Sequence, residues 1–439
     1  MNFSRYREVL GQWPVLRLIL VAMVARIPHA AAGVVLTLHV VNTMDLGYGA
    51  AGGVAAAVTV GMALGAPWRG RQVDVVGLRR ALIPSVIAEV VVWSAAPFLN
   101  YQLLLLAAAV GGAFAVPIFS VVRQALGVMV ATKDRRVAYS LDSIGAEITF
   151  MIGPAAGVLL ATSIDTRAGL ILVGAASALA GVALMWFNPP TRTGQPGAVP
   201  QDESSAWGDA DGGTAREVDS YEELAPVEAM AGQSSASGSY LGRVVHKARS
   251  NFGWVTVAVL AVLGASVGAG LVLSGTNVGM VALLNLHERI DDIGLVFVFW
   301  CGASVLGGII YGALHRPVSP LILLAAMALL TIPMGFATDA WTLGLLSIAP
   351  GLLCAPVLTS SAEQVAALVE EKRRGEAMGW YGSAMTLGSA AGSPLAGFMI
   401  DSIGPWAGFT FIGALATVLA IVGLVLKGIR RRAAEVPVA

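Results

Sequence analysis

Long apolar stretches alternate with short polar connections along almost the whole chain. Twelve of these stretches are about 20 residues long or more, enough for a helix to cross roughly 30 Å of hydrocarbon. They lie at 14–42, 47–68, 81–99, 102–122, 138–161, 169–188, 253–282, 293–314, 319–337, 341–362, 377–399 and 406–426. The pattern predicts an all-α polytopic membrane protein with twelve transmembrane helices. The first stretch has no clear small-residue cleavage site, so we expect a retained helix rather than a signal peptide.

An internal repeat relates the two halves of the chain. A shift of 240 residues aligns Pro154 with Pro394 and Gly157 with Gly397. Two six-helix bundles related by a parallel repeat are therefore expected. The stretch between them is rich in Pro, Gly, Ser and acidic residues, which predicts a disordered linker. The expected organisation is a first bundle at 1–188, a cytoplasmic linker at 189–250, a second bundle at 251–428 and a cytoplasmic tail at 429–439.

Composition and charge place the protein in a membrane. Of the 439 residues, 56% are hydrophobic and only 12% are charged, about half the charged fraction of soluble domains. The formal net charge is zero, which gives no indication of a nucleic-acid partner. With both termini in the cytoplasm, 23 of the 27 Lys and Arg residues fall on the cytoplasmic side and only Arg167 and Arg289 outside. The positive-inside rule thus predicts a multi-pass protein of the cell membrane in this orientation.

Enzyme and metal signatures do not stand out. The sequence has no Gly-x-Ser-x-Gly elbow, phosphate loop or nucleotide fingerprint. The segment "LHERIDD" lacks the second histidine of a zinc motif. Cys301 and Cys354 lie far apart in apolar stretches, and we interpret both as packing residues. We expect no catalytic activity, cofactor or metal.

The connection after the second stretch carries a spaced motif in "GRQVDVVGLRR". Its residues are Gly70, Asp74, Gly77, Arg79 and Arg80. The motif resembles the signature of the major facilitator superfamily, which implies a twelve-helix transporter fold and a role in closing the cytoplasmic face. Val75 departs from the family pattern, where a basic residue is usual. The alternative is a plain positive-inside loop.

The motif has a physical reason beyond the resemblance. Its glycines allow a tight turn and a close backbone approach. Asp74 can face the positive N-terminal end of a neighbouring helix, which the repeat identifies as the one starting near 375–377.

A small-residue element in the fifth span points to export. "IGPAAG" resembles an element found at this position in exporters of the family, and Gly153 and Gly157 would let a neighbouring helix approach while Pro154 permits a bend. The alternative is ordinary packing, since Pro394 and Gly397 repeat the element in the second half. Ala107 replaces an arginine that is common in proton-driven exporters, so their mechanism does not transfer unchanged.

Three ionisable side chains fall deep inside predicted spans, where charge is costly and therefore a functional hypothesis. Arg26, Glu89 and Glu147 each lie roughly 13–20 Å from the inner boundary at 1.5 Å per residue. The family resemblance places the first and fifth spans side by side, which makes Arg26 and Glu147 a pair that either couples a proton or stays a static ion pair. For Glu89 we favour a stabilising role within the bundle.

Further candidates follow from position. His29 lies one turn from Arg26 and is expected to line the same cavity. Ser274, Thr276 and Asn277 in the seventh span are expected either to contact a solute or to bond to one another. A cytoplasmic gate is a further hypothesis. Arg123 and Glu363, equivalent under the 240-residue shift, would form it, unless Glu363 pairs locally.

These observations predict a secondary transporter that works by alternating access. We expect proton-driven export of a small amphipathic or apolar solute by a monomer in the lipid bilayer. Uptake by proton symport is the alternative within this class. A membrane receptor or assembly factor that keeps the fold without transport is the alternative outside it.

Overall fold

Within the residues that it describes, 4–46, 48–200, 254–289, 292–314 and 316–434, the computed structural model is helical with short connections and contains no strand. The first half comprises α1 (Ser4–Gly11), α2 (Trp13–Leu38), α3 (Tyr48–Val76), α4 (Leu78–Ala95), α5 (Tyr101–Phe114), α6 (Ile118–Met129), α7 (Arg135–Ser163) and α8 (Thr166–Phe187). The second half comprises α11 (Val257–Leu286), α12 (Ile293–Gly312), α13 (Pro320–Thr331), α14 (Ala340–Leu368), α15 (Arg374–Ser402) and α16 (Pro405–Ala434).

The twelve predicted spans correspond to these helices, with α5 and α6 forming the fourth span together. Ten spans in the described residues are long and apolar enough to cross a membrane. The span at Pro320–Phe336 is shorter, and α15 is not among the ten although it has 29 residues. The all-α architecture of two six-helix bundles is confirmed.

Two sharp interruptions shape the first bundle. Gly77 alone separates α3 from α4, with a φ of 82° that favours glycine. The prediction of a loop at 70–80 is therefore wrong. Helix α3 continues through Val76, α4 begins at Leu78, and only Gly77 lies between them. The second interruption is at residues 115–117, between α5 and α6, where Pro117 precedes the first turn of α6 and cannot donate a backbone hydrogen bond.

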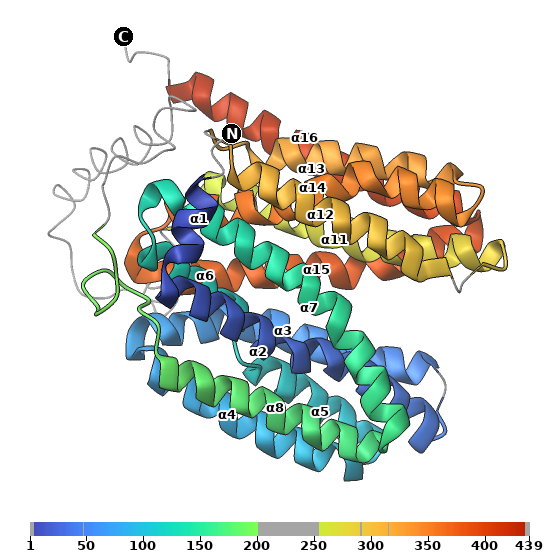
Figure 1. Cartoon of the computed structure of the whole chain (residues 1–439). Coiled ribbons are helices and arrows are strands. Elements are labelled where there is room, and N and C mark those ends of the chain that lie inside the picture. Colours follow the sequence, from blue (N-terminus) through green and yellow to red (C-terminus); the bar gives the residue numbers. More distant parts are fainter. Residues whose placement is uncertain (1–3, 47, 201–253, 290–291, 315, 435–439) are drawn as a thin grey trace, which may run out of the picture.

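The two bundles lie side by side and are in contact at one end (Figure 1). A buried apolar cluster at this end combines residues of both bundles, among them Val122, Tyr139, Val365 and Tyr381. Two other clusters belong to one bundle each. We call the end with the shared cluster, which carries α1 and the connections at 77, 130–134 and 369–373, the basic end.

The structural repeat is offset by 239 residues rather than the predicted 240. A 3₁₀ turn at Thr132–Asp134 precedes α7, and its counterpart at Glu371–Arg373 precedes α15. Helix α7 begins at Arg135 and α15 at Arg374, which is 239 residues later. A one-residue difference matters on a helix because it turns the side chain by about 100°.

The predicted linker lies mostly outside the described residues, which resume at 254. Its described start, at 189–200, contacts the second bundle: the Thr193 hydroxyl donates to the Glu371 carboxylate at 2.7 Å. The domain boundaries and the disorder of the linker stay predictions.

Candidate functional site

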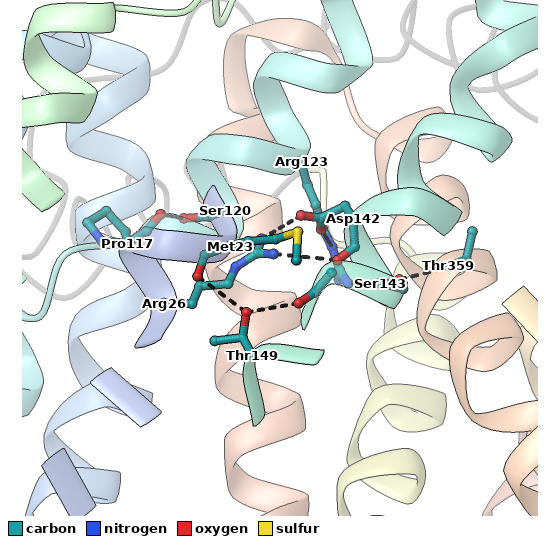
Figure 2. Close-up of polar contacts among 10 residues, drawn as sticks. Met23, Arg26, Pro117, Ser120, Arg123, Asp142, Ser143, Thr149 and Thr359 are labelled. Atoms are coloured by element: carbon teal, nitrogen blue, oxygen red, sulfur yellow. Dashed lines mark hydrogen bonds and ion pairs between the residues drawn. The ribbon is translucent and has the colours of Figure 1, made fainter. Parts of the chain in front are cut away.

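A buried ionic cluster lies within the first bundle, near its contact with the second (Figure 2). Arg26 Nη2 on α2 donates to Asp142 Oδ1 on α7 at 2.6 Å, and Arg123 Nε on α6 donates to Asp142 Oδ2 at 3.1 Å. The side chains are 2%, 4% and 0% exposed for Arg26, Arg123 and Asp142. Two cations thus share one carboxylate, and the cluster has one uncompensated positive charge.

The predicted pairing of Arg26 with Glu147 is wrong. Glu147 Oε1 instead accepts hydrogen bonds from Ser304 Oγ on α12 at 3.3 Å and from Cys354 Sγ on α14 at 3.0 Å. Asp142 and Glu147 are five residues apart on α7, so their side chains point about 140° apart around the helix axis. Asp142 therefore faces the first bundle and Glu147 faces the second.

A cavity of about 120 Å³ opens beside Arg26, where α5 gives way to α6. Arg26 and the predicted His29 line it from α2, Phe119 and Ser120 line it from α6, and Gly382 lines it from α15 of the other bundle. The predicted association of His29 with Arg26 is thus present. A role in binding stays a prediction.

Asp74 meets the beginning of α15, the contact that the motif predicted. Its Oδ1 accepts from the Gly375 amide at 3.1 Å and its Oδ2 from the Glu376 amide at 2.8 Å. The Gln124 side-chain amide also donates to Asp74, at 2.7 Å. A carboxylate on the free amides of a helix start is favourable because it satisfies unpaired donors and opposes the helix dipole. The carboxylate therefore ties the first bundle to the second.

A bidentate ion pair also joins the bundles at the basic end. Arg136 donates from Nε and Nη2 to the two oxygens of Glu363, at 3.1 and 3.2 Å, and the two side chains are 7% and 8% exposed. The predicted Arg123–Glu363 pair is absent, because Arg123 is bound to Asp142. Under the 239-residue offset Glu363 corresponds to Gln124 and not to Arg123.

Tyr6 on α1 adds a further contact between the bundles. Its hydroxyl donates to carbonyl oxygens of α12, with distances of 3.1 Å to Gly308 and 2.9 Å to Ile309. Burial raises the pKa of the Tyr6 phenol, so the group stays a hydrogen-bond donor at neutral pH. The N-terminal helix thereby reaches across the interface between the bundles.

Glycines of the motif allow the bundles to approach. A Cβ atom on Gly70 would lie 2.1 Å from the Gly375 carbonyl oxygen on α15, closer than any real contact. Gly153 and Gly157 allow a similar approach of α7 to α2, at Ala30 and Ala31. Both close approaches agree with the sequence interpretation.

The second-half counterpart of this packing element was misassigned. A Cβ atom on Gly397 would meet nothing within 4 Å, so this glycine packs against no helix in the described residues. On α15, Gly388 and Gly392 instead approach backbone atoms of α11 at Val267 and Leu271. Pro394 lies inside α15, as Pro154 lies inside α7.

The remaining candidates occupy varied surroundings. Glu89 accepts from the Trp93 indole at 2.6 Å on the same helix, α4, and its stabilising role within the bundle stays a prediction. Ser274 on α11 donates to the Ser389 carbonyl of α15 at 2.7 Å. Thr276 is buried without a hydrogen-bond partner, and Asn277 is exposed. In the motif, Arg79 donates to the Met185 carbonyl at 3.0 Å and Arg80 is exposed.

Asp142 and Arg136 are among the residues that the sequence interpretation missed, as are Tyr6, Gln124 and Arg69. Asp142 and Arg136 both belong to the segment "RRVAYSLDSIGAE", and Asp142 lies four residues inside the predicted fifth span. An acidic residue at that position is itself a signal of function in a membrane helix.

Two six-helix bundles joined by polar contacts define a polytopic membrane protein with two packed halves. The family model for the Major Facilitator Superfamily matches residues 18–278 and 262–439. The chain belongs to this superfamily, whose members are secondary transporters. A search among curated protein sequences finds no match.

Solved structures of the same fold match nearly the whole chain. The human organic anion transporter TETRAN is 16% identical, with 96% of this chain and 100% of that chain covered and a TM-score of 0.58. A bacterial homologue of the iron transporter ferroportin, in an outward-facing state, is 15% identical over 94% and 98% of the two chains, with a TM-score of 0.63. The proton:xylose symporter XylE is 14% identical over 93% and 94%, with a TM-score of 0.61. At these identities the similarity concerns the fold.

Proposed function

We propose that this protein exports a small amphipathic solute by alternating access, with the inward movement of protons as the driving force. It would act as a monomer in the cell membrane with its basic end in the cytoplasm. The observation that carries the proposal is the uneven distribution of hydrogen bonds along the interface between the two bundles, which we call the seam. The hydrogen bonds that join them involve residues at the basic end or in the middle of the helices, such as Asp74, Arg136 and Glu147.

An interface with contacts at one end and in the middle, but not at the other end, is expected for one endpoint of a rocking movement. The basic end is closed by charge-assisted hydrogen bonds, which can be exchanged for water when the bundles rock apart. The reverse state would close the opposite end and open the cavity toward the cytoplasm.

Glu147 is the proposed carrier of the coupling proton. It belongs to the first bundle, but both hydrogen-bond donors to its side chain come from the second. Rocking would withdraw Ser304 and Cys354 and admit water, and loss of such donors changes the proton affinity of a carboxyl group. Arg26 has no part in this step, because it is bound to Asp142.

The test combines ligand binding with proton movement. Purified protein is first screened for compounds that raise its unfolding temperature, since a ligand at 100 times its Kd adds about 2.7 kcal/mol. Each compound found is then added to proteoliposomes that contain a pH-sensitive dye. Export predicts that protons move opposite to the compound, and that Glu147→Gln binds the compound without coupled proton movement.

The outcomes separate the alternatives. Proton movement in the same direction as the compound would support the symporter instead. Wild-type coupling in Glu147→Gln would exclude this residue as the proton carrier. Binding without any movement of compound or proton in the wild-type protein would favour the receptor or assembly factor. Glu370→Gln is the matched control. Glu370 lies at the basic end and takes part in none of the contacts between the bundles that are described above.

A further inference from the structure

We infer that the cavity at the break between α5 and α6 binds the carboxylate of a small organic anion. This inference rests on the proposed transport function and specifies the class of its solute. The cavity is lined by Arg26, Arg69 and His29 and by no acidic residue. The two arginines are 3% and 1% exposed. Positive charge is therefore concentrated around a small space that contains no carboxylate of the protein.

The charges around the cavity do not cancel. Asp142 is shared by Arg26 and Arg123, so it neutralises only one of them. Arg69 donates to Gln72 Oε1 at 3.0 Å, to the Ala81 carbonyl at 2.6 Å and to Ser85, all of which are neutral. Among the described residues Arg69 has no acidic partner within salt-bridge distance. Uncompensated buried cations are costly, and an anionic ligand would remove this cost.

Two guanidinium donors beside the cavity are uncommitted. The Nε atoms of Arg26 and Arg69 are buried and have no hydrogen-bond partner among the residues that the structure describes. A guanidinium group offers five N–H donors, and Arg26 commits only Nη1 and Nη2 to Asp142. Its Nε is not committed to Asp142, but neighbouring atoms cover it in this conformation, so a ligand carboxylate would reach it once the cavity wall adjusts, without displacing Asp142.

The break in the fourth span adds a second source of positive potential. Helix α6 has 12 residues, begins at Ile118 and has no side-chain cap at Pro117. Its first-turn residues Phe119 and Ser120 line the cavity. The start of a helix carries unpaired amides and the positive end of its dipole. Together with the excess positive charge of Arg26 and Arg69, it makes the cavity suited to negative charge.

The rest of the wall is apolar and sets the size of the ligand. Phe119 packs over the Arg26 guanidinium, with 4.2 Å between the guanidinium carbon and the ring centre, and Met62, Ala66 and Met378 complete the surface. A cavity of about 150 Å³ can hold a benzene molecule, which is close to the 120 Å³ here. The ligand class is thus a compact monocarboxylate with an apolar body, for which benzoate is a suitable probe.

The site includes the other bundle, which connects binding to movement. Met378, Gly379, Gly382 and Thr386 of α15 form one wall of the cavity, and α2, α3, α5 and α6 form the others. A ligand held by Arg26 would touch both bundles only while the basic end is closed. Binding should therefore favour the conformation described here.

The test compares three ligands of one shape and different charge. Thermal unfolding and calorimetric titration of the purified full chain are measured with benzoate, benzamide and benzylammonium, and with chloride. Benzoate is expected to bind at least tenfold more tightly than benzamide, and benzylammonium is expected not to bind. Equal binding of benzoate and benzamide, or binding of chloride alone, would overturn the inference.

Two substitutions locate the site. Gly382→Leu fills the cavity, and a Cβ atom there meets nothing within 4 Å, so folding should be preserved while benzoate affinity falls at least tenfold. Gly264→Leu on α11, where a Cβ atom also meets nothing within 4 Å, is the matched control and should bind normally. Arg26→Gln should lose the preference for benzoate over benzamide. Undiminished benzoate affinity in Gly382→Leu would overturn the inference even if Arg26→Gln fails to fold.

Failure of the two proposals can be distinguished. Binding to the purified protein needs no proton gradient. Benzoate binding without transport would leave the anion site intact and contradict the proposed function. Transport of neutral compounds by a protein that does not bind benzoate would contradict the anion site alone.

Discussion

Asp142 is the carboxylate on which two buried arginines depend. Replacing it with Asn keeps the size of the side chain but leaves Arg26 and Arg123 facing one another without an anion. Breaking a buried ion pair in this way costs about 3–5 kcal/mol. We expect Asp142→Asn to lower the free energy of unfolding by about this amount, measured by thermal or denaturant unfolding in detergent.

An exposed pair of the same chemistry is the control. Arg289 and Asp292 are 2.6 Å apart but 59% and 32% exposed, and such pairs contribute about 0.2–1 kcal/mol. Asp292→Asn should therefore change stability little. Similar effects of the two substitutions would show that burial does not determine how much the Asp142 cluster contributes to the free energy of unfolding.

Asp74 acts at a single point where the bundles meet. Asp74→Asn removes the charge and one of two acceptor oxygens, which weakens the contact with the α15 amides by about 0.3–1 kcal/mol, or about 2 kcal/mol if partly buried. We expect the basic end to open more often. Cysteines placed in the cavity wall should then react faster with a reagent applied from that side, and unchanged labelling would mean that the contact does not control closure.

The contact of Asp74 with the start of α15 could be predicted from motif spacing and the internal repeat, whereas the partners of Arg26 and Glu363 could not. The spacing of Gly70, Asp74 and Gly77 fixed both a turn and a contact, because the three lie on one continuous stretch. The partner of Arg26 was assigned from depth in the membrane and from the family resemblance, which places the first and fifth spans side by side. Depth fixes a height along the helix axis but not the direction in which a side chain points, and so Glu147 was chosen where Asp142 was correct.

At the scale of elements, α3 and α15 pack so closely that a methyl group does not fit. Gly70→Ala would place a Cβ atom 2.1 Å from the Gly375 carbonyl oxygen, so the two helices must separate. We expect this variant to fold, since each bundle keeps its own core, and to show increased labelling of the basic end. The measurement is cysteine accessibility, as for Asp74→Asn.

Gly397→Ala on α15 is the matched control for helix propensity. It also replaces a helical glycine with alanine, but a Cβ atom there meets nothing within 4 Å. Its labelling should equal that of the wild-type protein. If Gly70→Ala also labels like the wild type, the close approach of α3 and α15 is not required for closure.

Hydrophobic length predicted the existence of the helices, but their interruptions required local chemistry. The fourth span reads as one apolar stretch at 102–122, although Pro117 divides it into α5 and α6. Gly77 was interpreted as part of a loop, although one residue with positive φ is enough to turn the chain. In both cases a single residue acts on the backbone without altering the hydrophobic pattern.

At the scale of the whole molecule, Arg136 and Glu363 hold the bundles together across the seam. Arg136→Glu and Glu363→Arg each bring like charges together and should reduce transport and open the basic end. The double variant restores opposite charges and should recover much of both. If the double variant is as poor as the worse single one, the pair does not contribute to closure. The control is the same exchange of charges at the exposed pair Arg289–Asp292, which should change neither transport nor opening.

The repeat explains why Arg123 was predicted as the partner of Glu363. An offset of 240 residues aligned Arg123 with Glu363, and the actual offset of 239 aligns Gln124 with Glu363. Sequence similarity between the halves is too weak to fix an alignment to one residue. Helix boundaries in the structure fix it directly, at Arg135 and Arg374.

The contacts that close the basic end also determine when closure can occur during synthesis. Tyr6 bonds to Ile309, Asp74 to Glu376 and Arg136 to Glu363, so each contact spans between 227 and 303 residues. Domains generally fold as units as the chain emerges, N-terminal first. The first bundle is therefore expected to complete its own core while these three polar groups still lack their partners in the second bundle. Closure of the seam is then the last step of assembly, and a chain that ends after the first bundle should insert and fold but present an uncovered polar face to cellular quality control.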